Sequence, residues 1–417
     1  MIVIAVLAAV AVMAVLSALH WYLWRRLVVA TTMPGTPARR AGTAFFTAAP
    51  VLAVAALVGE RLPMPMPVKS VLAWPGLLWL AVFLYLLLAV LVGEIVRPLL
   101  TRWLARRDAA PALAPAMAAP AGDLPVPDAE PVPAGKPTDA PAGLSRRLFV
   151  SRVVGGAAAA AAVGTVGYGT FNVVKGPAVK HVTVPLAKLP RTAHGFRIAV
   201  VSDIHLSPVL GRRFAQRVTD TINATQPDLI TVVGDLVDGD VDELADSVEP
   251  LRGLRSRHGT FFVTGNHEYF SGAEQWVEKV RELGWQPLAN ARTAMPGFDL
   301  AGVNDLGGES TGQGPDFGKA LGDRDPTRAA VLLAHQPDVI HDAVRYGVDL
   351  QLSGHTHGGQ MWPATYLAEA ANPTNAGLER YGDTQLYVSR GAGAWGPPVR
   401  IGAPSDITVV ELASRQA

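Results

Sequence analysis

Four apolar stretches in the first 175 residues place the strongest constraint on how this chain can fold. Each is long enough, or nearly so, to cross a ~30 Å hydrocarbon core as a helix. They cover Met1–Trp24, about Thr43–Val58, about Val71–Val92 and Gly155–Gly169. Buried core helices are the alternative, but the hydrophobic content of 49% is high for a soluble protein, and the stretches have aromatic and arginine edges typical of a membrane boundary. We therefore predict three transmembrane helices within residues 1–107 and a fourth membrane segment within residues 145–175.

The arginines around these stretches predict their orientation. They gather in two loops: Arg25, Arg26, Arg39 and Arg40 between the first and second stretches, and Arg97, Arg102, Arg106, Arg107, Arg146, Arg147 and Arg152 between the third and fourth. Loops rich in Lys and Arg tend to stay in the cytoplasm. The pattern therefore predicts a multi-pass protein of the cell membrane, in contact with the lipid bilayer, whose C-terminal half lies outside the cytoplasm.

Residues 108–144 are rich in Ala and Pro, a composition that cannot form a packed core, and we predict a disordered, partly extended linker there. The sequence Ser145-Arg-Arg-Leu-Phe-Val150 follows and resembles a twin-arginine export signal. Val150 and Ser151 depart from that pattern, which usually has Leu and Lys at these positions. The alternative is that Arg146 and Arg147 are only the positive flank of a membrane helix.

From about residue 181 onward, short apolar runs alternate with amphipathic stretches. Strands are predicted at Arg197–Ser202, Leu229–Val233, Thr260–Thr264, Leu300–Val303, Ala330–Ala334, Asp349–Leu352, Gln385–Ser389 and Ile407–Leu412. Helices are predicted at Arg212–Ala224, Val241–Arg255, Glu274–Leu283 and Pro337–Tyr346. This alternation predicts one α/β domain over residues 181–415, with helices covering the sheet.

Side chains that can bind metals follow the ends of five predicted strands. In chain order they are Asp203 and His205, then Asp235 and Asp238, then Asn266, His267 and Glu268, then His335, and finally His355 and His357. Ligands bind beyond the carboxyl ends of the strands in open α/β sheets, so we expect these side chains to meet. Each group alone also fits a turn, a helix start or a hydrogen-bonded core histidine, and Glu268 fits a helix start equally well. Five groups in order favour a site for divalent ions, with Mn, Fe and Zn all compatible with mixed nitrogen and oxygen ligands.

The ordered motifs Asp-x-His, Gly-Asp-x-x-Asp, Gly-Asn-His-Glu, a single His and Gly-His-x-His resemble the calcineurin-like metallophosphoesterase superfamily. The tail from Tyr387 to Leu412 resembles the membrane-anchored bacterial branch of that superfamily. The resemblance implies a four-layer α/β/β/α sandwich, preceded here by transmembrane helices. It also implies a phosphoester hydrolase.

The resemblance further implies two divalent metal ions and a metal-bound hydroxide that attacks phosphorus. One ion would bind Asp203, His205, Asp235 and His357, and the other Asp235, Asn266, His335 and His355. Asp235 would therefore be shared. His267 matches the position of the general acid that protonates the leaving group, and Asp238 is expected to orient a ligand or its neighbour.

One departure from the family pattern bears on the substrate. Protein phosphatases of the superfamily carry an Arg after the second Asp of Gly-Asp-x-x-Asp, where this chain has Gly239. The difference favours a phosphodiester or a pyrophosphate, with an envelope lipid such as a UDP-diacylglucosamine-like molecule as one candidate. The formal net charge of +1 indicates no nucleic-acid partner, and the absence of Cys excludes thiolate ligands. The alternative function is a metal-containing envelope protein that binds or assembles without catalysis.

Overall fold

The computed structural model describes residues 2–108 and 146–416. They form two units, one from the described parts of residues 1–47 and 83–163, and the other from residues 48–82 and 164–416. The predicted linker lies outside the described residues, except for Asp108 at the end of a helix.

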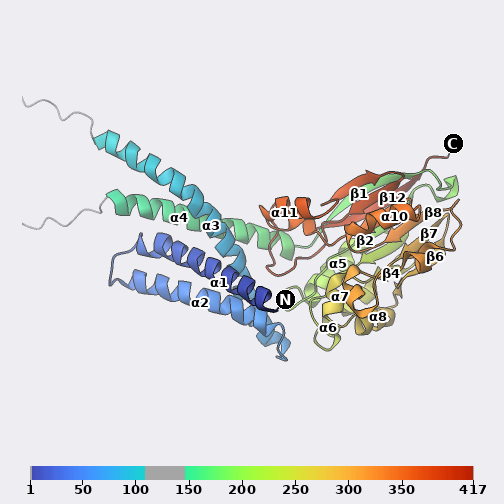
Figure 1. The fold of residues 1–417 in the computed structure, drawn as a ribbon, viewed down its shortest axis with the longest axis horizontal. Coiled ribbons are helices and arrows are strands. Elements are labelled where there is room, and N and C mark those ends of the chain that lie inside the picture. Colours follow the sequence, from blue (N-terminus) through green and yellow to red (C-terminus); the bar gives the residue numbers. More distant parts are fainter. Residues whose placement is uncertain (1, 109–145, 417) are drawn as a thin grey trace, which may run out of the picture. The chain divides into compact units, whose positions relative to one another are not determined.

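The apolar stretches lie in four helices, α1 (Ile2–Trp24), α2 (Pro37–Gly59), α3 (Met66–Asp108) and α4 (Arg146–Val174) (Figure 1). A π-helical turn at Arg25–Val29 follows α1. All four helices are long and apolar enough to cross a membrane. The third helix, α3, continues well past the predicted apolar stretch, because its polar end is rich in Leu and Arg, which favour a helix.

Two six-stranded sheets form the framework of the second unit (Figure 1). The first has the order β1-β12-β2-β3-β4-β5 and consists of β1 (Ala178–Leu186), β2 (Phe196–Val201), β3 (Leu229–Val233), β4 (Thr260–Val263), β5 (Gln286–Pro287) and β12 (Asp406–Ser414). The second has the order β10-β11-β9-β8-β7-β6 and consists of β6 (Ala291–Met295), β7 (Phe298–Gly302), β8 (Ala329–Leu333), β9 (Leu350–Ser353), β10 (Gly377–Tyr381) and β11 (Thr384–Val388). Strands β2, β3 and β4 are parallel to one another, and so are β7, β8 and β9. The carboxyl ends of three neighbouring strands therefore meet in each sheet.

The sheets pack face to face, and helices cover their outer faces. Side chains from β2, β3, β4, β7, β8 and β9 share one buried apolar cluster between the sheets. A second cluster joins the first sheet to α5 (Arg212–Ala224), α6 (Val241–Val248) and α8 (Ala273–Glu282), and a third joins the other sheet to α9 (Phe317–Leu321) and α10 (Ile340–Arg345). Shorter elements are α7 (Asn266–Phe270), α11 (Ala364–Ala371) and 3-10 turns at Arg191–Ala193, Glu249–Gly253, Leu306–Thr311, Pro337–Val339 and His357–Gly359. The predicted α/β/β/α sandwich is confirmed.

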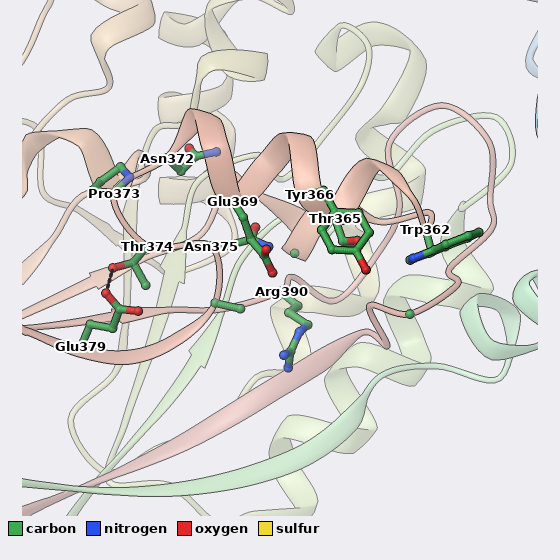
Figure 2. Close-up of a pocket in the computed structure, with 13 residues that line it drawn as sticks. Trp362, Thr365, Tyr366, Glu369, Asn372, Pro373, Thr374, Asn375, Glu379 and Arg390 are labelled. Atoms are coloured by element: carbon green, nitrogen blue, oxygen red, sulfur yellow. Dashed lines mark hydrogen bonds between the residues drawn. The ribbon is translucent and has the colours of Figure 1, made fainter.

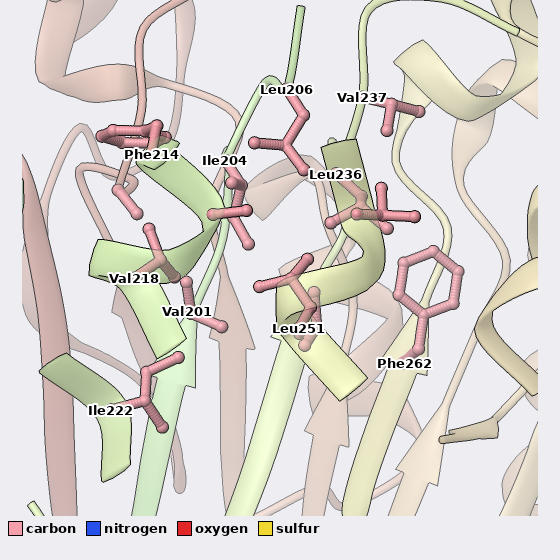
Figure 3. Close-up of a cluster of buried hydrophobic side chains, with 14 of the residues drawn as sticks. Val201, Ile204, Leu206, Phe214, Val218, Ile222, Leu236, Val237, Leu251 and Phe262 are labelled. Atoms are coloured by element: carbon pink, nitrogen blue, oxygen red, sulfur yellow. The ribbon is translucent and has the colours of Figure 1, made fainter. Parts of the chain in front are cut away.

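Helix α5 illustrates how the sequence produces this packing. Phe214, Val218 and Ile222 are spaced four residues apart, so they lie on one face of the helix. All three are buried and point toward the first sheet near Val201 of β2 (Figure 3). The sheet is thus held firmly just before the loop that carries Asp203.

Candidate metal centre

Ten side chains that the sequence singled out follow five parallel strands, three in one sheet and two in the other. Asp203 and His205 follow β2; Asp235 and Asp238 follow β3; Asn266, His267 and Glu268 lie in α7 after β4; His335 follows β8; and His355 and His357 follow β9. Five of them have a left-handed backbone, with φ of 52° at Asp203, 47° at His205, 51° at Asp235, 73° at His355 and 52° at His357. This conformation is uncommon for residues other than glycine and gathers at functional sites. Sharp turns at the strand ends therefore bring the side chains together.

The first cluster consists of Asp203, His205 and His357, all buried. The Nε2 atoms of His205 and His357 lie 3.0 Å apart, and His357 Nε2 lies 3.4 Å from Asp203 Oδ1. Both carboxylate oxygens of Asp203 also accept the backbone N–H of His355, at 3.0 and 3.1 Å, which ties the β2 loop to the β9 loop.

The second cluster consists of Asp235, His335 and His355. His335 Nε2 lies 3.2 Å from Asp235 Oδ2, and His355 Nδ1 lies 3.0 Å from Asn266 Oδ1. The same oxygen of Asp235 lies 3.6 Å from His205 Nε2 in the first cluster. Asp235 is therefore placed between the two clusters.

The chemistry of His335 tests whether a cation fits here. Its Nδ1 lies 2.9 Å from the carbonyl oxygen of Val233, which can only accept, so Nδ1 carries the proton. In the neutral ring, Nε2 is then a bare acceptor that faces the Asp235 carboxylate, and this buried atom has no hydrogen-bond partner. Two acceptors facing each other away from water require a proton or a cation between them. The donor set therefore fits a divalent metal ion.

Charge balance at the cluster points the same way. Burial lowers the pKa of His335, but Asp235 and Asp203 outweigh burial and raise it well above the usual value. Burial also opposes the charged form of His205, yet Asp238, Asp235 and Asp203 raise the pKa of His205 to about 9. The carboxylates thus demand positive charge that neutral imidazoles do not supply. Bound cations would supply it.

His357 differs from these two histidines. Burial lowers the pKa of His357 to about 4, and Arg400 adds to the effect despite the opposing Asp203. This imidazole is therefore neutral near pH 7, and its Nδ1 accepts a hydrogen bond from Arg400 Nη2 at 3.1 Å. Arg400 is itself buried; its Nη1 donates to the carbonyl oxygen of His357 at 3.0 Å, and its Nε donates to that of Gly393 at 2.8 Å. No local pattern in the sequence marks Arg400.

Asp238 connects the first cluster to His267. Its Oδ1 lies 2.7 Å from both His205 Nδ1 and His267 Nδ1. Burial opposes ionisation of Asp238, but His205 and His267 outweigh burial and lower its pKa, so it is a carboxylate that accepts from both rings. Because Nδ1 of His267 is bound to Asp238, Nε2 is the ring nitrogen left for another partner. The rings of Phe270 and Trp395 flank His267, with centroids at 5.7 and 5.8 Å.

Glu268 supports the loop that carries Asp235. This buried side chain accepts the backbone N–H groups of Gly265, Asp235 and Leu236 at 2.6, 3.0 and 2.8 Å. Burial, together with Asp235, raises the pKa of Glu268 to about 7. The sequence is equally consistent with Glu268 as a residue at the start of a helix. Glu268 has two roles in the structure. It lies in the first turn of α7, and its carboxylate also fixes the turn that carries Asp235.

A pocket of about 500 Å³ is lined in part by Gly358, the residue that follows His357 of the first cluster (Figure 2). Trp362 lies at one end of it, and Thr374 and Glu379 at the other. Arg390, which also lines the pocket, precedes Gly391, whose added Cβ would lie 2.5 Å from Asp203 Cβ. The pocket therefore offers polar and charged side chains, and two of its lining residues, Gly358 and Arg390, are one position away in the chain from His357 and Gly391.

An α/β/β/α sandwich with clustered Asp, His and Asn side chains at the strand ends defines a class of metal-binding hydrolases. Residues 196–359 match the family model described as calcineurin-like phosphoesterase. The chain is 38% identical over 259 residues to a "Transmembrane protein with metallophosphoesterase domain" from Danio rerio, covering 59% of each chain. It is 32% identical over 288 residues to "Uncharacterized metallophosphoesterase YkuE" from Bacillus subtilis, covering 65% of this chain and 98% of that protein. This chain belongs to the calcineurin-like metallophosphoesterase family.

A third relative, an "Uncharacterized metallophosphoesterase" from Aquifex aeolicus, is 32% identical over 242 residues, which is 57% of this chain and 92% of that protein. The match to the Danio rerio protein spans only 59% of that protein's length. Relatives thus come from both a vertebrate and bacteria.

Proposed function

We propose that this chain hydrolyses phosphodiester or pyrophosphate bonds with two divalent metal ions. The observation that carries the proposal is the position of Asp235 between two buried clusters, with a histidine held by Asp238 beside them. Asp203, His205, Asp235 and His357 would hold one ion, and Asp235, Asn266, His335 and His355 the other. When bound, such ions lower the pKa of water to supply hydroxide near neutral pH and offset charge on the phosphoryl group.

The protein's own groups would orient ligands and move one proton. Asp238 accepts the Nδ1 proton of His205, which leaves His205 Nε2 to face the cluster. Asp238 holds His267 in the same way, so that His267 Nε2 is the atom that would deliver a proton to the departing alkoxide. The backbone N–H of His267 donates to Asp235 Oδ1 at 2.9 Å, which fixes the distance between the acid and the shared carboxylate.

Turnover of bis(4-nitrophenyl) phosphate tests the proposal directly. The full chain would be purified in detergent, loaded in turn with Mn²⁺, Fe²⁺ or Zn²⁺, and assayed with Asp235→Asn as the inactive control. We expect turnover that disappears with a chelator and returns with metal. A protein that holds two ions per chain and turns over neither this diester nor pyrophosphates would instead be a non-catalytic metal protein.

The substrate class within this proposal is a lipid-linked diester or pyrophosphate, of which a UDP-diacylglucosamine-like molecule is one candidate. It is supported by the apolar helices and by Gly239 at the position where protein phosphatases of the superfamily carry an Arg. A screen of lipid-linked and nucleotide diesters tests it, with metal content measured on the same samples. Faster turnover of soluble nucleotide diesters than of any lipid-linked one would contradict the lipid assignment.

The location proposed for the enzyme is a membrane crossed by α1 to α4, with the catalytic domain outside the cytoplasm. The tail's resemblance and the twin-arginine-like sequence support a place in the membrane-anchored bacterial branch. Replacing Arg146 and Arg147 by Lys keeps the positive charge, so the positive-inside rule alone predicts no change. A twin-arginine route predicts that the domain of this variant becomes protected from protease added to intact spheroplasts. If the variant is still digested from outside, the export signal is excluded and α4 is an ordinary membrane helix. If the unaltered protein is protected in spheroplasts but cleaved after lysis, the proposed topology is reversed.

A further inference from the structure

Helix α11 is unusual among the helices of the catalytic domain because none of its eight residues is buried. Tyr366 and Leu367 are 63% and 73% exposed, and Trp362, just before the helix, is 45% exposed. Thr365, Tyr366 and Glu369 line the pocket that includes Gly358 and Arg390 (Figure 2). The face that carries Leu367 is apolar and open, while another face borders the pocket.

The segment before α11 is held against the loop that packs on α4. Trp362 donates its backbone N–H to the carbonyl oxygen of Ile401 at 2.8 Å. Arg400 in that loop donates its backbone N–H to the carbonyl oxygen of Gly169 in α4 at 3.3 Å. A Cβ added at Gly169 would lie 2.6 Å from Val399 and 2.7 Å from Ile401, so the loop meets the helix backbone closely.

The contact between this loop and Gly169 lies close to the C-terminal end of α4. Gly169 lies five residues before Val174, the last residue of the candidate membrane span, which corresponds to ~7.5 Å of helix. Tyr168 and Phe171 beside it are 66% and 63% exposed. Trp and Tyr are enriched at the headgroup level at the ends of membrane helices, and Tyr168 fits that position. The loop, and α11 with it, therefore start at the depth where a bilayer meets water.

We propose that Trp362, Tyr366 and Leu367 form a bilayer-docking surface, with α11 lying in the headgroup region of the membrane that α4 crosses. Amphipathic helices that lie in the membrane interface bury an apolar face ~5–10 Å into the boundary between headgroups and acyl chains. This placement would open the pocket between α11 and Arg390 toward lipid headgroups, so that a lipid-linked phosphoester reaches the clusters without leaving the bilayer. The inference rests on the proposal that α4 spans the membrane, and the occupant of the surface is the lipid of that same membrane.

Site-specific fluorescence tests the docking surface in the full chain. The sequence has no Cys, so a single introduced Cys takes a polarity-sensitive label at one position. Leu367→Cys is the test position; Glu278→Cys on α8, whose native side chain is 65% exposed, is the aqueous control, and Val163→Cys on α4, 60% exposed, is the lipid control. Each labelled protein would be placed, one copy per nanodisc, in lipid with a nitroxide either near the headgroup or near the end of the acyl chain.

We expect the label at residue 367 to shift to shorter wavelength and to be quenched several-fold more by the headgroup-side nitroxide than the label at residue 278. A water-like spectrum at 367, with quenching equal to that at 278, would overturn the docking surface if the label at 163 is quenched. Loss of quenching at 163 as well would instead overturn the membrane span of α4, and with it this inference. In a further sample with two copies per disc, a shift of the label at residue 367 to shorter wavelength that is absent with one copy would assign the surface to a second copy. That result would also overturn bilayer docking. None of these readouts depends on turnover, so they can fail independently of the phosphoesterase proposal.

Discussion

Replacing Asp238 by Asn should damage metal binding and proton delivery together. One oxygen of this carboxylate accepts from His205, a proposed metal ligand, and from His267, the proposed acid, each at 2.7 Å. Asn has almost the same shape, so the substitution removes charge and little else. Asp240→Asn is the matched control, because Asp240 lies nearby at the start of α6 and makes no side-chain capping hydrogen bond.

The expected magnitude follows from the two hydrogen bonds. Bonds to charged groups contribute ~1.5–3 kcal/mol and neutral ones ~0.5–1.5 kcal/mol, so neutralisation costs about 1–1.5 kcal/mol per bond. That is roughly 5- to 13-fold for each histidine, and roughly 30- to 160-fold for both. The side chain of Asp238 is 18% exposed, so water screens part of its charge and the lower values apply.

Assays at different metal concentrations distinguish the loss that acts through His205 from the loss that acts through His267. With limiting metal, the variant should lose both factors, whereas saturating metal should restore the His205 contribution and leave roughly a 5-fold loss in kcat. In a His267→Ala background, Asp238→Asn should have no further effect at saturating metal, because its remaining partner is gone. A loss that is the same at every metal concentration would refute the link to His205. A full additional loss in the His267→Ala background would refute the link to the acid.

Three further substitutions test the rest of the centre. His267→Ala should keep both metals and lose ~10²–10⁴-fold in kcat/KM on alkyl esters but much less on 4-nitrophenyl esters, whose leaving groups need no proton; equal losses would make the residue structural. Asp235→Asn should abolish turnover and lower the metal content from about two ions per chain to one or none, and two retained ions with full activity would exclude a shared carboxylate. Gly265→Ala should also reduce the metal content per chain, because its Cβ would lie 2.2 Å from Asp235 Oδ1. The backbone itself tolerates Ala, since φ of Gly265 is −104°. Gly253→Ala is the control, because its Cβ would make only a 3.5 Å contact.

The sequence predicted the interior of both sheets better than their edges. All eight predicted strands match strands of the structure within a few residues, and the four strands that were missed, β1, β5, β6 and β10, are the outermost strands of the two sheets. Interior strands have buried neighbours on both sides and consist of apolar runs, such as Leu229–Val233. An edge strand such as β10 (Gly377–Tyr381) has no buried residue, so hydrophobic periodicity gives little indication of it.

The candidate site follows the same logic. Metal-ligand types placed directly after apolar strands were visible in the sequence, because parallel strands bring their carboxyl ends to one edge. The roles of Glu268 and Arg400 were not visible, since each acts on a loop distant in sequence: Glu268 on the backbone N–H of Leu236, and Arg400 on the carbonyl oxygen and Nδ1 of His357. Such contacts depend on how loops distant in sequence approach one another. The pattern of residues within one segment does not predict these contacts.

The contacts around α7 explain why the proposed acid and the shared carboxylate keep a fixed relation. Glu268 in α7 accepts from Asp235 N at 3.0 Å, and the neighbouring His267 N donates to Asp235 Oδ1 at 2.9 Å. The β3 loop and α7 therefore hold each other through both the backbone and the carboxylate of Asp235. A Cβ added at Gly265 would lie 2.2 Å from Asp235 Oδ1, so the two segments also approach each other closely there. The geometry needed for proton delivery is thus built by the same hydrogen bonds that place Asp235 between the two clusters.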